Sequence, residues 1–68
     1  MEDKKVLKVL NHLEARKKLY TKRYNELTKK YSDTDDENEL NELLLNINHY
    51  ESITEELSEI ISYIENIL

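Results

Sequence analysis

The sequence predicts an all-α fold in which two long helices form an antiparallel hairpin. Three observations lead to this prediction: the chain has neither glycine nor proline, apolar residues recur at alternating steps of four and three, and one polar segment interrupts that pattern. Sheets and tight turns depend on glycine and proline, whereas the abundant Glu, Lys and Leu favour helices. We expect the 68 residues to form one domain, with a helix at about 3–31, a turn at about 32–34 and a second helix at about 35–68.

In each predicted helix, apolar and aromatic residues return every three or four positions along one side, which is the pattern of a coiled-coil seam. In the first helix the seam positions are Val6, Leu10, Leu13, Lys17, Tyr20, Tyr24, Leu27 and Tyr31. In the second helix they are Leu43, Ile47, Tyr50, Thr54, Leu57, Ile61, Ile64 and Leu68. Lys17 and Thr54 interrupt the two seams at similar heights. Either they form a polar layer that sets the register, or the Lys17 stem packs flat and its ammonium reaches water.

The segment between the two seams is rich in Ser, Thr and Asp, which favour helix ends over helix interiors. Thr34 and Glu37 have the spacing of a capping box, in which each side chain would bond an exposed amide at the start of the second helix. A single continuous helix is the alternative, because no glycine or proline forbids it. If the break holds, the short turn makes the two helices antiparallel neighbours.

The second predicted helix carries more apolar side chains than one partner helix can cover. We therefore expect an interface formed by Leu40, Leu44, Ile47, Ile53, Leu57, Ile60, Ile64 and Ile67. The simplest closure is a homodimer that forms a four-helix bundle. The alternative is a groove that a helix of another protein fills.

Charge is divided between the two predicted helices, since every Lys and Arg lies within residues 4–30 and none follows. The simplest role of this division is to draw the helices together. An exposed basic stripe in the first helix can also follow phosphates, so the alternative function is nucleic-acid binding through Lys4, Lys8, Lys18, Lys22 and Lys29. The net charge of −5 opposes that alternative. The acidic second helix can instead capture a basic partner.

No pattern in the sequence predicts catalysis, a cofactor or a metal site. There is no cysteine, His12 and His49 stand alone, and the alternating acids at 33–39 lack the Gly and the final Glu of a calcium loop. No membrane span or secretory signal is expected, so the cytoplasm is the expected compartment. We predict a small non-enzymatic protein–protein interaction module, such as an inhibitor, adaptor or assembly factor. A purely structural oligomer fits the sequence equally well.

Overall fold

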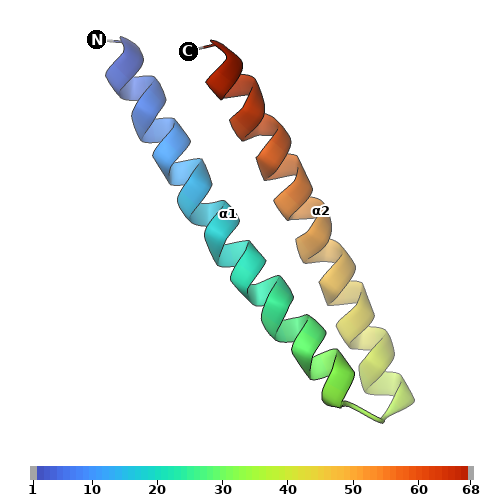
Figure 1. Cartoon of the computed structure of the whole chain (residues 1–68). Coiled ribbons are helices and arrows are strands. Elements are labelled where there is room, and N and C mark those ends of the chain that lie inside the picture. Colours follow the sequence, from blue (N-terminus) through green and yellow to red (C-terminus); the bar gives the residue numbers. More distant parts are fainter. Residues whose placement is uncertain (1, 68) are drawn as a thin grey trace.

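Two helices make up the part of the chain that the computed structural model describes, residues 2–67. Helix α1 spans Glu2–Asp33 and helix α2 spans Glu37–Ile67, with residues 34–36 between them. They lie side by side and antiparallel, so that the start of α1 and the end of α2 are at the same end (Figure 1). Within residues 2–67 there is no strand, and the all-helical prediction is confirmed.

The connection lies about two residues later than the sequence predicts, and its capping chemistry is different. The expected capping box of Thr34 and Glu37 does not form, because α2 begins at Glu37 and Thr34 lies outside it. The Thr34 hydroxyl instead donates to the Lys30 carbonyl at 2.6 Å, at the end of α1. Asp36 caps α2: its Oδ1 accepts a hydrogen bond from the Asn38 amide at 3.0 Å.

Helix α1 ends without the left-handed residue that glycine often supplies, because no residue within 2–67 has a positive φ. Thr34 takes over that role with two donors: its hydroxyl bonds the Lys30 carbonyl and its amide bonds the Tyr31 carbonyl. The charges near the break suit the helix dipoles, with Lys30 in the last turn of α1 and Glu37 and Glu39 in the first turn of α2. Local side chains are therefore sufficient to end one helix and start the next.

The core is a single seam between the helices, and it follows the heptad positions. The buried side chains are Leu10, Leu43, Ile47 and Ile61. Half-buried seam positions are Val6, Leu13, Lys17, Tyr20, Tyr24, Leu27, Tyr50, Thr54, Leu57 and Ile64. Tyr31 is exposed because it lies in the last turn of α1, where no further turn covers it. The final seam position, Leu68, lies outside the described residues.

An aromatic pair at mid-length shows the axial register of the two helices, that is, which residues of α1 and α2 lie at the same height along the hairpin. The rings of Tyr20 and Tyr50 have their centroids 5.8 Å apart, and their planes are tilted by 32°. Lys17 lies one turn before Tyr20, and Thr54 lies one turn after Tyr50. Because the helices are antiparallel, these two polar residues fall at the same height, and both are half-buried. Lys17 and Thr54 therefore form a polar layer close to the middle of the seam.

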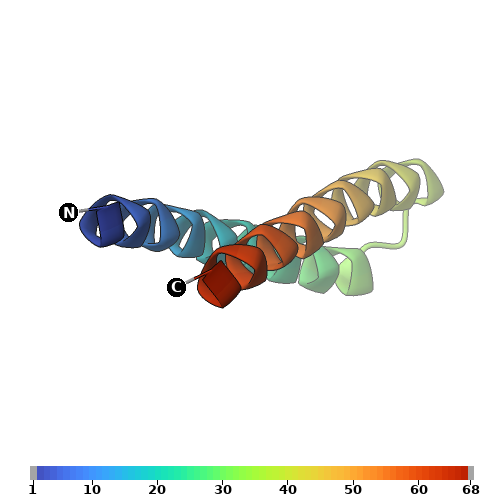
Figure 2. The same cartoon turned by 90° about the horizontal axis from the view of Figure 1, so that it is seen from above.

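The hairpin is long and thin, with extents of 54 × 14 × 12 Å. Its radius of gyration is 15.6 Å, whereas a compact domain of this length would have about 11 Å. Seen from above, the helices are inclined to each other and cross (Figure 2), as helices that interlock along a seam do. Such a shape leaves most side chains in contact with solvent on both sides of the seam.

Candidate interaction surface

Besides the seam, each helix carries side chains that flank it on either side. Residues seven apart point in nearly the same direction on a helix, so the flanking residues form one stripe on each side. Two grooves between the helices show which stripes meet. Val9 and Ile67 line one groove, and Thr21 and Glu51 line another. The hairpin therefore has two broad faces, one on each side of the seam.

We name these two faces after the isoleucines of one and the threonines of the other. The isoleucine face consists of Val9, Arg16, Arg23 and Lys30 from α1 and Glu39, Asn46, Ile53, Ile60 and Ile67 from α2. The threonine face consists of Leu7, Glu14, Thr21 and Thr28 from α1 and Leu44, Glu51, Ser58 and Glu65 from α2. The isoleucine face has four β-branched apolar side chains, whereas the threonine face has only two apolar residues.

The isoleucine face changes character along its length. Toward the open end of the hairpin it is apolar, with a groove of about 260 Å³ lined by Lys5, Val6, Val9, Ile64 and Ile67. Toward the turn it is polar, with a second groove lined by Arg23, Glu26, Leu27, Lys30, Asn46 and Tyr50. Between them lies Arg16, whose Nη2 donates to the Tyr20 hydroxyl at 2.8 Å and whose guanidinium lies 5.6 Å from the centroid of the same ring.

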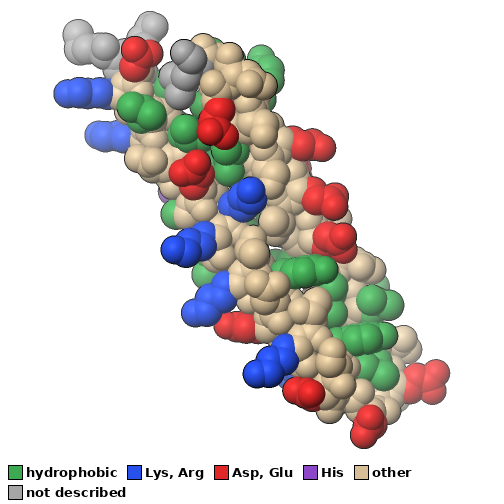
Figure 3. Space-filling view, in the orientation of Figure 1, with side chains coloured by type: hydrophobic (Ala, Val, Ile, Leu, Met, Phe, Trp, Pro, Cys, Tyr) green, Lys and Arg blue, Asp and Glu red, His purple; other side chains and the backbone are tan. Residues whose placement is uncertain are grey.

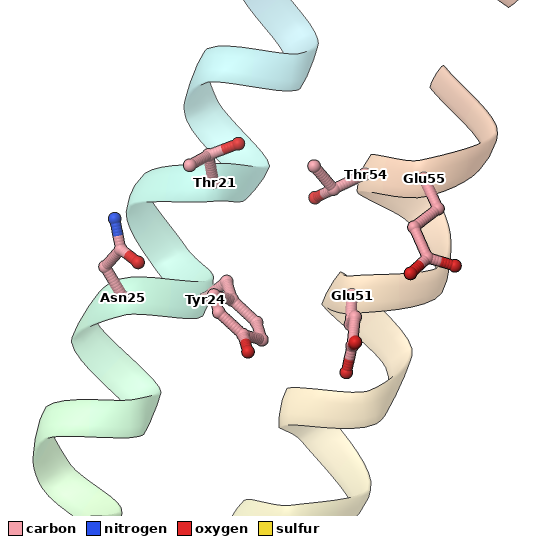
Figure 4. Close-up of a pocket in the computed structure, with 6 residues that line it drawn as sticks. All are labelled: Thr21, Tyr24, Asn25, Glu51, Thr54 and Glu55. Carbon is pink, nitrogen blue, oxygen red and sulfur yellow. The ribbon is translucent and has the colours of Figure 1, made fainter. Parts of the chain in front are cut away.

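The threonine face is mostly polar. Its central groove of about 270 Å³ is lined by Thr21, Tyr24, Asn25, Glu51, Thr54 and Glu55 (Figure 4). The Thr54 hydroxyl donates to the Tyr50 carbonyl at 2.8 Å, and the Ser58 hydroxyl donates to the Thr54 carbonyl at 2.9 Å. These hydroxyls already donate to their own helix, which is the usual behaviour of Ser and Thr inside helices. The two apolar residues of this face, Leu7 and Leu44, are exposed near opposite ends of the hairpin.

The structure divides the eight predicted interface residues among different environments. Ile47 is buried in the seam, and the half-buried members are Leu40, Ile53, Leu57 and Ile64. Leu44, Ile60 and Ile67 are exposed, but Leu44 lies on the threonine face and the two isoleucines lie on the other. One partner surface placed against one face therefore cannot reach all three exposed members.

Three further large apolar residues are exposed away from both faces. They are Leu19, Leu45 and Tyr63, which lie in neither the seam nor the two faces. Leu45 is the most exposed, at 72 %. Their only signal in the sequence is an apolar side chain at a position that faces away from the seam, and an isolated residue of that kind is common on protein surfaces.

The charges of the hairpin follow the two helices. The five lysines of the predicted basic stripe are all exposed on α1. From Glu2 to Asp33, α1 has ten basic and five acidic residues, a charge of +5; from Glu37 to Ile67, α2 has eight acidic and no basic residues, a charge of −8. On the face shown in Figure 3, Lys and Arg side chains lie along the α1 edge and acidic side chains project along α2. The molecule therefore has one basic and one acidic edge.

Both histidines are exposed, and the His49 ring meets the Tyr50 ring edge-on, with centroids 5.6 Å apart. In the described part of the chain, no group of three or more His, Cys, Asp or Glu side chains is arranged to hold a metal ion.

Neither α1 nor α2, as described, contains an apolar stretch long enough to cross a membrane. Comparison with family models, with curated proteins and with solved structures found no match to this chain.

Proposed function

We propose that this chain is a small, non-enzymatic protein–protein interaction module that acts through a helical surface. In this proposal it serves as an inhibitor, adaptor or assembly factor, and its hairpin pairs with a second copy to form a four-helix bundle. The support is an excess of exposed apolar surface: among the described residues only four side chains are buried, while Val9, Ile60 and Ile67 on the isoleucine face are open to solvent. Apolar groups gathered on a small protein usually mark a contact surface.

The total surface area gives a measure of this excess. The hairpin exposes 5675 Å², whereas a compact monomer of 8.2 kDa would expose about 4,500 Å². The hairpin therefore exposes roughly 1,100 Å² more than a compact monomer of its mass. An uncovered seam flanked by water on both sides is marginal for a domain of this size, which has no cysteine to form a disulfide.

A second copy would remove this excess. A compact dimer of twice the mass would expose about 7,500 Å², which is roughly 3,800 Å² less than two separate hairpins. Burial of that size lies within the range of about 2,000–5,000 Å² found for obligate homodimers. The area that a compact dimer would bury is therefore an ordinary amount for a homodimer interface.

Sedimentation and thermal unfolding over a thousandfold range of protein concentration test this proposal together. We expect the sedimenting mass to double with rising concentration and the melting temperature to rise with it, because association stabilises the folded state by mass action. A folded monomer at every concentration, with a constant melting temperature, would contradict self-association. In that case the exposed apolar face would have to be covered by a different protein.

A second candidate function is nucleic-acid binding, favoured by the exposure of all five stripe lysines on α1. Binding of this kind releases counterions, so its affinity falls steeply as salt rises, whereas an apolar interface is not weakened in that way. Titration of a short DNA duplex at low and high salt separates the two functions. Salt-sensitive binding that is lost when Lys18 and Lys22 are replaced by Glu would favour this candidate.

A further inference from the structure

The isoleucine face differs from the threonine face in a way that bears on how two copies can meet. Its apolar members, Val9, Ile53, Ile60 and Ile67, lie in the half of the hairpin toward the open end. Of its polar members, Arg16 lies near mid-length, and Arg23, Lys30, Glu39 and Asn46 lie toward the turn. The threonine face has no such apolar half, because Leu7 and Leu44 lie at opposite ends and carboxylates separate them.

We infer that a second copy covers the isoleucine face, with a twofold axis parallel to the length of the hairpin. In this arrangement the two turns lie at the same end of the bundle, and α1 of each copy packs over α2 of the other. The inference rests on the proposed self-association and adds to it the face, the direction and the pairing of helices.

Charge is the first reason for this direction. Two hairpins with their lengths aligned can stack face to face about a twofold axis in only two ways. With the axis along the hairpin, α1 lies over α2 of the second copy, and a helix of charge +5 meets one of charge −8 at both contacts. With the axis across the hairpin, α1 lies over α1 and α2 over α2, so helices of like net charge meet at both contacts. Complementary potentials favour the first arrangement and like-charge contacts oppose the second.

The position of the apolar residues is the second reason. The Tyr20–Tyr50 pair shows that residues of α1 and α2 whose numbers sum to about 70 lie at the same height. With both turns at one end, Ile60 lies over Val9 of the second copy, and Glu39 lies over Lys30 of the second copy. An apolar residue thus meets an apolar one at Ile60, and a carboxylate meets an ammonium at Glu39, while Ile53 lies over the aliphatic stem and guanidinium of Arg16. The reversed arrangement would place Ile60 and Ile67 against the polar turn end, where unpaired polar groups would lose water.

The first test replaces one isoleucine of this face and uses a matched control on the other. Ile60 and Leu44 both lie on α2 and are similarly exposed, at 40 % and 44 %. We expect Ile60→Glu to raise the dissociation constant of the dimer on the order of a hundredfold or more, because each copy would bury an unpaired carboxylate. Leu44→Glu should leave it nearly unchanged. Circular dichroism of each variant checks that the helices remain folded.

The second test measures direction without altering the interface. Asp35 is exposed in the turn, and the chain has no cysteine, so Asp35→Cys carries a single spin label. Helices in contact lie about 8–10 Å apart, so turns at one end place the two labels within about 25 Å of each other. In the reversed arrangement the labels are separated by nearly the 54 Å length of the hairpin. Double electron–electron resonance spectroscopy distinguishes these distances, and it is done on a protein whose proposed interface carries no substitution.

A short label distance together with dissociation by Ile60→Glu alone is the expected result. A dimer with a distance near the full hairpin length would overturn the inferred direction, and a dimer broken by Leu44→Glu rather than Ile60→Glu would overturn the inferred face. Both of those outcomes leave self-association intact. A protein that stays monomeric at every concentration would overturn the inference and the proposed self-association together.

Discussion

Replacement of Ile47 by alanine should remove a large share of the stability of the hairpin. Ile47 is only 7 % exposed and is one of four side chains that are buried among residues 3–67. Truncation of a buried Ile to Ala costs about 2–5 kcal/mol, depending on how well the site collapses. Here the seam is flanked by solvent, so we expect the lower part of that range, about 2–3 kcal/mol. A 68-residue domain has roughly 3–10 kcal/mol in total.

Leu45→Ala is the matched control, because it removes the same number of carbon atoms from the same helix, two positions away. Leu45 is 72 % exposed, so we expect a change within about 0.5 kcal/mol. In urea unfolding at one fixed protein concentration, the midpoint of Ile47→Ala should fall clearly and that of Leu45→Ala should not. In thermal unfolding the Ile47 variant should melt about 10–20 °C lower.

Equal losses in these two variants would refute the assignment of the core. Such a result would mean that Leu45 is covered in solution, or that Ile47 does not lie in the seam. A loss at Leu45 that grows with protein concentration would identify the outer side of α2 as a contact between copies, in conflict with the isoleucine face.

Two further predictions concern local contacts. Asp36→Ala should lower the free energy of unfolding by about 1 kcal/mol through loss of the bond to the Asn38 amide; Asp35→Ala should not, and equal effects would contradict the cap. A double-mutant cycle of Tyr20→Leu and Tyr50→Leu should give a coupling of about 0.5–1.5 kcal/mol, since their rings are in contact. A coupling near zero would mean that the rings do not meet in solution.

The sequence by itself determined the two helices and the side of each that meets the other. The absence of glycine and proline leaves helices as the favoured structure. The alternation of steps of four and three places Leu10 in the seam of α1, and Ile47 and Ile61 in the seam of α2. This was predictable because periodicity is a property of a single helix, independent of its partner. Even the shared height of Lys17 and Thr54 in the polar layer follows from counting turns along two antiparallel seams.

Only the tertiary structure decided where the remaining apolar residues lie relative to one another. The sequence placed Leu44 and Ile60 in one predicted interface, yet they lie on opposite faces of the hairpin. The helical spacing already puts Leu44 and Ile60 on opposite sides of the α2 seam, but which stripe of α1 lies beside each of them depends on how the two helices are placed. The cap was undetermined for a similar reason: Thr34 can bond backward to Lys30 or forward into α2, and the choice depends on where α1 ends.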